Sequence, residues 1–194
     1  INSLENAIKK YKPKALIAVD IYGNSCDYDS LLYLSKKYNM KIIEDAAESL
    51  GSKYKGKQCG SFGDVGIISF NGNKIITTSS GGILVSKNNE YVLKAKFLSN
   101  QAREEELHYE HKELGYNYRL SNILAGIGCA QLQRLNEFVH NRRRIYENYF
   151  NSFSKIDGIK FMKESKESYI NRWLTTFTID SSKIKVSRDK IIAK

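Results

Sequence analysis

The segment Lys41-Ile42-Ile43-Glu44-Asp45 decides the fold of this chain, because its apolar residues predict a buried strand that closes on a carboxylate. Before it, residues 28–38 carry Leu31, Leu34 and Tyr38 at helical spacing, and residues 15–19 form another apolar run. A strand, helix, strand order implies parallel pairing of the two strands. We therefore predict an α/β fold with a mainly parallel sheet flanked by helices.

The pattern continues on both sides of this unit. We expect helices over residues 4–11, 90–106 and 121–150, the last with Ser121 as its N-cap, and strands over residues 65–70, 82–86 and 173–179. A further helix starts near Ser187. The long helix after Ser121 becomes more polar beyond residue 140. We therefore divide the chain into residues 1–140, part of a large domain, and residues 141–194, a connecting helix and the start of a smaller α+β domain.

The formal net charge of +10 raises the question of nucleic-acid binding. The lysines are scattered, and the dense run Arg142-Arg143-Arg144 lies within a helical pattern, which favours a solvated helix face. A nucleic-acid-binding surface would combine clustered basic residues with stacking aromatic residues. We therefore expect no nucleic-acid partner, and a diphosphate-bearing substrate would account for some of the basic charge.

The cysteines and the hydropathy indicate a cytoplasmic protein. Cys26, Cys59 and Cys129 lie far apart without Cys-x-x-Cys spacing, which favours a reducing compartment over a disulfide framework. No apolar run approaches the roughly 20 residues that a membrane-spanning helix needs. We expect no membrane partner.

Three chemically distinct side chains fall at or just after predicted strand ends, where open α/β sheets bind ligands. Asp45 ends one strand, Ser69 lies at the end of the next, and Lys74 follows Asp45 by 29 residues. A lysine amine can form an imine with an aldehyde cofactor, and a carboxylate can pair with a pyridinium nitrogen. This order of residues is the one that a pyridoxal 5'-phosphate enzyme needs.

Other interpretations of these residues remain open from the pattern alone. Lys74 is also compatible with an ordinary surface lysine, and Asp45 with a cap of a following helix that has Glu48 three residues on. His108 and His111 lack a third ligand nearby, so we predict no metal site.

Several separate motifs, in the same order, resemble those of the DegT/StrS family of nucleotide-sugar aminotransferases, over nearly the whole chain. They are Glu44–Gly51, Tyr54–Lys57, Gly60–Asp64, Ser69–Phe70, Lys74, Thr77–Thr78 and Gly115–Ser121. The resemblance implies the large domain of a fold-type-I pyridoxal phosphate enzyme, incomplete here, followed by the start of a small domain.

The resemblance also implies a role for each matching residue. Lys74 matches the lysine that forms the Schiff base with the cofactor, and Asp45 the carboxylate paired with its pyridine nitrogen. Glu48 matches the residue that hydrogen-bonds the ring hydroxyl, and Ser69 the serine that binds the cofactor phosphate. Asn117 matches an asparagine that reaches the cofactor phosphate of the neighbouring subunit, which implies a homodimer with shared active sites.

The substrates follow from the same resemblance. Asn71–Lys74, Gln101–Arg103 and His108–His111 are similar to members that aminate the C4 keto carbon of nucleotide-linked keto-deoxy sugars, with glutamate as the usual amino donor. Family members that act as dehydratases have histidine in place of the lysine, so Lys74 argues against dehydration. The position of Arg119 is compatible with a structural or a phosphate-binding role.

Two departures from the family pattern affect these expectations. Ser79-Ser80-Gly81-Gly82 stands where many members have Gly-Glu-Gly-Gly, which changes the charge of the turn. Family chains are about twice as long, so this chain resembles a central portion without the segment that stacks an aromatic residue on the cofactor ring. The alternative to a sugar aminotransferase is therefore a catalytically inactive fragment that at most binds cofactor or a partner chain.

Overall fold

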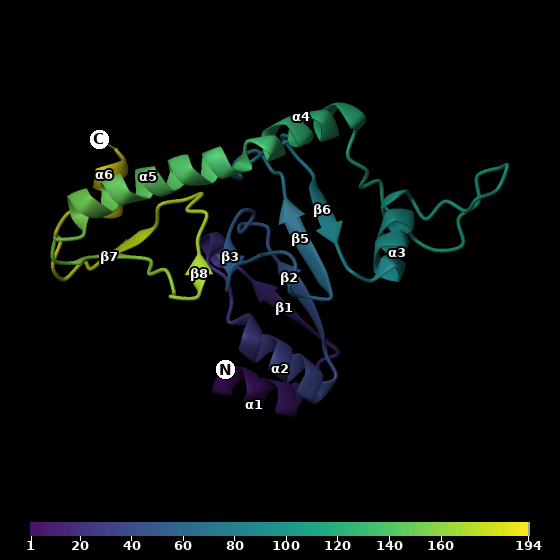
Figure 1. Cartoon of the computed structure of the whole chain (residues 1–194), viewed down its shortest axis with the longest axis horizontal. Helices are drawn as coiled ribbons and strands as arrows, with labels where there is room; N and C mark the ends of the chain where they lie inside the picture. The colour runs from purple at the N-terminus through teal and green to yellow at the C-terminus, as the bar shows by residue number, and fades with distance from the viewer. Residues whose placement is uncertain (194) are drawn as a thin grey trace.

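Parallel pairing of three strands organises the structure, a computed structural model that describes residues 1–193. The central sheet has the order β1-β2-β5-β6, with β1 and β5 parallel to β2 and β6 antiparallel to β5 (Figure 1). Its strands are β1 (Ala15–Val19), β2 (Lys41–Asp45), β5 (Val65–Ser69) and β6 (Gly82–Val85). The predicted strand, helix, strand unit is confirmed by α2 (Tyr28–Tyr38) between β1 and β2. The sheet is thus mixed but mostly parallel.

Helices cover one face of β1 and β2, and the other face of β1 is open. α1 (Asn2–Tyr11) and α2 lie together against this part of the sheet (Figure 1). The core between them includes Ala18, Tyr28, Leu31 and Ile42 in one cluster, and Ile8, Leu34 and Met40 in a second. Ile17 and Val19 face the opposite way and are 63% and 47% exposed. Because Val19 pairs with Asp45, that carboxylate lies on the open side.

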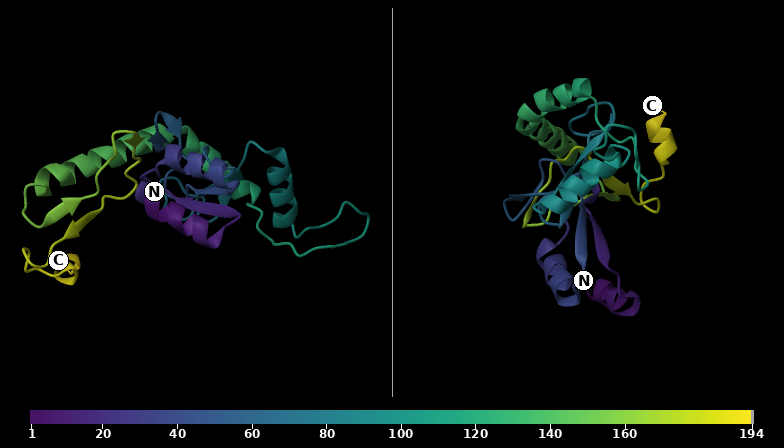
Figure 2. Two further views of the ribbon diagram at one scale, coloured as in Figure 1. Left: turned by 90° about the horizontal axis from the view of Figure 1, so that it is seen from below. Right: turned by 90° about the vertical axis from the view of Figure 1, so that its right-hand side faces the viewer.

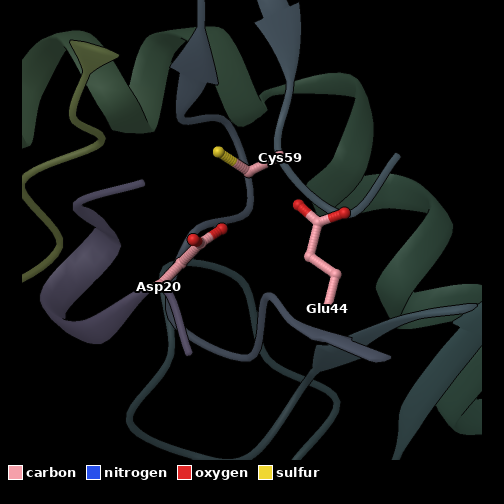
Figure 3. A group of neighbouring side chains, drawn as sticks. All are labelled: Asp20, Glu44 and Cys59. Atoms are coloured by element: carbon pink, nitrogen blue, oxygen red, sulfur yellow. The ribbon is translucent and has the colours of Figure 1, made fainter. Parts of the chain in front are cut away.

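Two buried carboxylates hold the loops beside the strand ends (Figure 3). Glu44 points to the covered face and accepts hydrogen bonds from the backbone N–H groups of Gly60, Phe62 and Gly63 at 2.5, 2.6 and 3.1 Å. Asp20, which follows β1, accepts from the hydroxyls of Tyr28 and Ser49. Buried charges require such partners, so these bonds fix the loops after β1 and β2 to the core.

The remaining elements extend the molecule at both ends. They are the 3-10 turn Ile21–Gly23, β3 (Lys53–Tyr54), β4 (Lys57–Gln58), α3 (Asn89–Ser99), α4 (Asn122–Gln133), α5 (Leu135–Phe153), β7 (Ile159–Phe161), β8 (Ser168–Tyr169), β9 (Phe177–Ile179) and α6 (Arg188–Ile192). α4 and α5 run in line from the sheet to the C-terminal elements, while the loop after α3 projects at the other end (Figures 1 and 2). β8 pairs with β3, which ties the C-terminal part back to the sheet region.

Several predicted bounds are wrong, each for a local reason. The helix expected over residues 90–106 ends at Ser99, because Gln101 and Ala102 adopt positive φ angles of 62° and 49°. The helix expected from Ser121 to residue 150 is interrupted at Arg134, although Ser121 caps it as predicted by accepting from Leu124 N–H.

The strand expected over residues 173–179 is present at 177–179 alone. Its first part is instead a buried irregular segment around Trp173, which is 4% exposed. The strands expected over residues 65–70 and 82–86 are each one residue shorter. The helix start at Ser187 is confirmed by its hydrogen bond from Lys190 N–H.

The predicted division after residue 140 falls inside α5, and it stays a prediction. Lys194, the last residue of the predicted second unit, lies outside the described residues. No helix within residues 1–193 is both long enough and apolar enough to span a bilayer.

We predict that Glu44→Ala lowers the free energy of unfolding by about 3 kcal/mol, because one buried and two partly buried N–H groups lose their acceptor at once. Urea unfolding followed by circular dichroism measures the change. Glu105→Ala, at an exposed loop position, is the matched control. A loss below about 1 kcal/mol for Glu44→Ala would contradict a structural role for this carboxylate.

We predict that Glu5 makes the stability of the fold depend on pH in the acid range, through its contacts with α2. Hydrogen bonds from Lys37 and Tyr38, both 2.7 Å, lower the pKa of Glu5 from 4.5 to about 2. A lowered folded-state pKa gives stability that is present above pH 4.5 and lost as the pH falls towards 2. Glu5→Gln should make the urea unfolding midpoint depend less on pH in this window. If the midpoint of Glu5→Gln changes with pH as steeply as that of the control Glu105→Gln, the role of Glu5 is refuted.

Candidate active site

The carboxyl ends of β2 and β5 place the predicted residues at one edge of the sheet. Asp45 is the last residue of β2 and Ser69 the last residue of β5, and the two strands are parallel neighbours. Lys74 follows β5 by five residues. Asp45, Ser69 and Lys74 therefore lie at or just after strand ends, as predicted. This edge is where open α/β sheets bind ligands.

The Lys74 amine lies in a partly buried environment between a carboxylate and an aromatic ring. Its Nζ is 3.4 Å from Glu48 Oε1, and the two side chains are 14% and 25% exposed. The same Nζ lies 4.6 Å from the ring centroid of Trp173. Lys74 is therefore not an ordinary exposed lysine, and the alternative that it is a surface residue is wrong.

Asp45 is followed by a turn rather than a helix, and Glu48 lies in that turn. The side chain of Asp45 accepts from Ala47 N–H at 3.1 Å, and residues 47–51 form a turn, so Asp45 caps no helix. Glu48 Oε2 accepts from Tyr22 N–H at 2.6 Å. This bond orients the carboxylate whose other oxygen meets Lys74.

Hydrogen bonds and close packing anchor the loop that carries Lys74 to α4. Gln131 hydrogen-bonds both backbone groups of Thr77, donating to its carbonyl at 2.6 Å and accepting from its N–H at 3.0 Å. A Cβ on Gly128 would lie 2.9 Å from Thr78, so the helix and the loop pack closely. Thr78 N–H in turn donates to the carbonyl of Phe70. These contacts fix the start and the end of the lysine loop.

Ser69 and Asn117 lie in different surroundings. Ser69 Oγ accepts from Asn71 N–H at 3.3 Å, which leaves its hydroxyl proton free to donate. Asn117 is exposed on a segment that pairs with the end of α3 through backbone bonds of Tyr116 and Tyr118. No hydrogen bond joins Asn117 to Lys74, Asp45 or Glu48 within the described residues, and its backbone pairs with Asn100.

The remaining residues singled out from the sequence lie at the surface of the described structure, except Arg143, which is partly buried and departs from the expected solvated helix face. His111 Nδ1 lies 2.8 Å from the carbonyl of Gln101, and His108 lies 3.5 Å from Glu110. Arg119 is exposed. In the basic run, Arg142 and Arg144 are exposed, whereas Arg143 donates to Glu164 at 2.8 Å and to the carbonyl of Ile170 at 2.6 Å.

Asp20, Glu44 and Cys59 are close enough to resemble a metal-binding group, with ligand atoms within 4.8 Å of one another (Figure 3). Every carboxylate oxygen of the two acids already accepts a hydrogen bond from the protein. Burial, together with these two carboxylates, raises the pKa of the Cys59 thiol, and a protonated thiol is a poor metal ligand. The group is best explained as structural.

The side chains at this sheet edge fit pyridoxal 5'-phosphate in their chemistry. They offer an amine for an aldehyde, carboxylates for a ring nitrogen and a ring hydroxyl, and a short hydroxyl for a phosphate. A buried donor also lacks a partner here, since Trp173 Nε1 has no acceptor within the described residues. Unpaired buried donors are rare in folded proteins and often mark functional sites.

Four residues of this region were missed by the sequence analysis. They are Glu44, Gln131, Asn171 and Trp173. For Glu44 a signal existed, because a carboxylate at an inward position of an apolar strand must have buried partners. The other three depend on contacts between distant segments, which no local pattern reveals.

Comparison with known proteins supports the assignment to a pyridoxal phosphate-dependent aminotransferase family. The sequence profile described as the DegT/DnrJ/EryC1/StrS aminotransferase family matches residues 1–194. EpsN of Bacillus subtilis (strain 168), which carries the name of a pyridoxal phosphate-dependent aminotransferase, is 54% identical over 184 residues, covering 92% of this chain and 47% of EpsN.

A second relative is the UDP-4-amino-4,6-dideoxy-N-acetyl-beta-L-altrosamine transaminase of Campylobacter jejuni subsp. jejuni serotype O:23/36 (strain 81-176). It is 41% identical over 143 residues, which cover 73% of this chain and 38% of the transaminase. Among solved structures, Helicobacter pylori PseC, an aminotransferase involved in the biosynthesis of pseudoaminic acid, superimposes with a TM-score of 0.84 at 26% identity, covering 92% of this chain and 49% of PseC.

The chain spans about half the length, or less, of the relatives it matches. Within that span the family profile covers every residue, and the matched segments carry the lysine, the carboxylates and the serine at the sheet edge. The chain therefore belongs to the DegT/DnrJ/EryC1/StrS aminotransferase family, a family of pyridoxal phosphate-dependent enzymes that includes sugar aminotransferases.

Proposed function

We propose that the protein transfers an amino group from glutamate to the C4 keto carbon of a nucleotide-linked keto-deoxy sugar, with pyridoxal 5'-phosphate as cofactor. The observation that carries the proposal is the partly buried Lys74 amine, 3.4 Å from Glu48, beside the strand end that bears Asp45. The relative whose name specifies a 4-amino-4,6-dideoxy sugar supports the choice of C4.

Each residue at the sheet edge has a defined part in this proposal. Asp45 would pair with the ring nitrogen, Glu48 with the ring hydroxyl, and Ser69 would donate to the phosphate. The bound cofactor supplies an electron sink for the carbon next to the transferred nitrogen. Lys74 would accept the proton from that carbon of the amino donor and return a proton when the sugar is aminated.

We propose that the whole protein is a homodimer in which Asn117 reaches the cofactor phosphate of the partner. The exposure of Asn117 supports this, because an exposed amide is available to contact a second subunit. Large exposed apolar side chains also lie on the same segment of the chain, residues 107–118, and exposed apolar surface is typical of interfaces. They are Leu107, Tyr109, Leu114, Tyr116 and Tyr118, from 47% to 106% exposed.

We further propose a cytoplasmic location, which the three free cysteines support. The alternative function is a chain that binds cofactor or a partner without turnover. The coverage of about half of EpsN favours this alternative for residues 1–194 taken alone. Assays of residues 1–194 beside the whole protein, each with pyridoxal phosphate, glutamate and a nucleotide-4-keto-6-deoxy sugar, separate the two.

We predict that Lys74→Ala lowers kcat by at least about 100-fold, because the general acid and base is removed. Borohydride reduction after addition of pyridoxal phosphate should leave a pyridoxyl group on Lys74 of the wild type, located by peptide mass spectrometry. Lys36→Ala, an exposed lysine on α2, is the control and should keep both activity and label. A Lys74→Ala protein with wild-type turnover would exclude the assigned role.

We predict that mixing inactive Lys74→Ala and Asn117→Ala proteins restores activity, because each mixed dimer has one intact site. Random reassociation makes about half the dimers mixed, so about a quarter of wild-type activity is expected. The measurement is turnover after the two variants are unfolded and refolded together, against each variant refolded alone. Activity that stays at the level of the single variants would mean that Asn117 serves its own subunit or no site.

A further inference from the structure

Trp173 reaches Lys74 from a part of the chain that is 99 residues away in sequence. Its ring centroid lies 4.6 Å from Lys74 Nζ, a distance at which an aromatic face attracts an ammonium group. The ring is 4% exposed, so the contact is largely shielded from water. Glu48 approaches the same nitrogen at 3.4 Å. The lysine amine thus has two neighbours that restrict where it can point.

Asn171 fixes the position of Trp173. Its side-chain amide donates to the carbonyls of Glu48 and Leu50, both at 2.9 Å, and its carbonyl oxygen accepts from Trp173 N–H at 3.1 Å. Its own N–H donates to Ser52 Oγ at 2.9 Å. The residue is fully buried. One asparagine therefore joins the turn that carries Glu48 to the backbone that carries the indole ring.

The approach of Asn171 to this turn depends on Gly23. A Cβ at Gly23 would lie 2.2 Å from Asn171 Oδ1 and 3.1 Å from the carbonyl of Glu48. Gly23 also has φ +80°, a conformation that L side chains rarely adopt. The 3-10 turn after β1 is thus shaped to admit the asparagine.

The outer side of the segment is anchored to α5. Arg172 has a positive φ of 53° and its guanidinium lies 3.7 Å from the Tyr146 ring centroid. Arg143 and Glu164 bind the backbone of Ile170 at its carbonyl and its N–H. A non-glycine residue keeps such a conformation where the surrounding contacts determine it. Residues 170–173 are therefore held on both sides.

We propose that Trp173 is a positioning residue for Lys74, and that residues 170–173 form a clamp that joins the C-terminal part of the chain to the catalytic lysine. This rests on the proposed function, since Lys74 is the residue whose amine must be aimed at the cofactor aldehyde. The indole face holds the ammonium group of unreacted Lys74 beside Glu48, and Asn171 holds the indole. The geometry requires the ring face rather than the Nε1 proton, so phenylalanine can replace Trp173 and leucine cannot.

The test measures the rate at which pyridoxal phosphate labels Lys74 in the whole protein, by borohydride reduction at timed intervals and peptide mass spectrometry. Trp173→Leu should label Lys74 about tenfold more slowly than wild type, whereas Trp173→Phe should label it within about twofold, because phenylalanine keeps an aromatic face. Labelling of exposed lysines such as Lys36 is the internal control and should not change. A folded Trp173→Leu protein with the wild-type rate would overturn the proposal.

A second measurement tests the contact between Trp173 and Lys74 independently of the proposed function. Trp173 is the one tryptophan of residues 1–194, so the emission spectrum of a protein of these residues reports this contact without cofactor. Lys74→Met should change that emission, and Lys36→Met should not. If wild-type Lys74 takes no label, the proposed function fails while the emission still decides the contact. Unchanged emission in Lys74→Met would overturn the clamp, including where Trp173→Leu fails to fold by circular dichroism.

Discussion

The candidate site depends on one constraint, the parallel pairing of β1, β2 and β5. Parallel neighbours bring their carboxyl ends to the same edge, and each strand here ends on a polar residue or just before one. Asp20 follows β1, Asp45 ends β2 and Ser69 ends β5. A register shift by one residue would exchange Asp45 and Glu44 between the open and covered faces. The three amide donors that bind Glu44 would then lose their acceptor, so the same bonds stabilise the register and select Asp45 for the open face.

The lysine itself is placed by segments on three sides. Gln131 of α4 anchors the loop that carries Lys74. The turn after β2 supplies Glu48, and the segment before β9 supplies Trp173. An exposed ion pair is worth at most about 1 kcal/mol, and a partly desolvated cation–π contact up to about 2 kcal/mol. At 14% exposure the Lys74 side chain lies between the exposed and the buried limits, so neither contact alone accounts for its position. The two together restrict the amine more than either does.

Local sequence patterns predicted the elements around the site well and the elements beyond it less well. The strand ranges 15–19 and 41–45 and the helix 28–38 match the structure, because each strand is a short apolar run and the helix has apolar residues at helical spacing. Asp45, Glu48, Ser69 and Lys74 could be singled out because they follow such strands. The helix end at Ser99 was missed although Asn100, its C-cap, is a residue type that favours helix ends. The break at Arg134 could not be predicted, since arginine is not a typical turn residue.

The clamp illustrates the limit of such predictions. Alternation of apolar and polar residues suggested a strand over 173–179, yet Trp173 is buried in an irregular segment. In that segment Asn171 hydrogen-bonds to Glu48, Leu50 and Ser52. A tryptophan with a buried, unpaired Nε1 and an arginine at positive φ are both unfavourable locally. They persist because Asn171 satisfies two carbonyls of the opposite segment and the N–H of Trp173, and because Gly23 leaves room for it. Local strain in the C-terminal part is thus balanced by contacts with the turn of Glu48, which makes the carboxylate, the lysine and the indole parts of one packed unit.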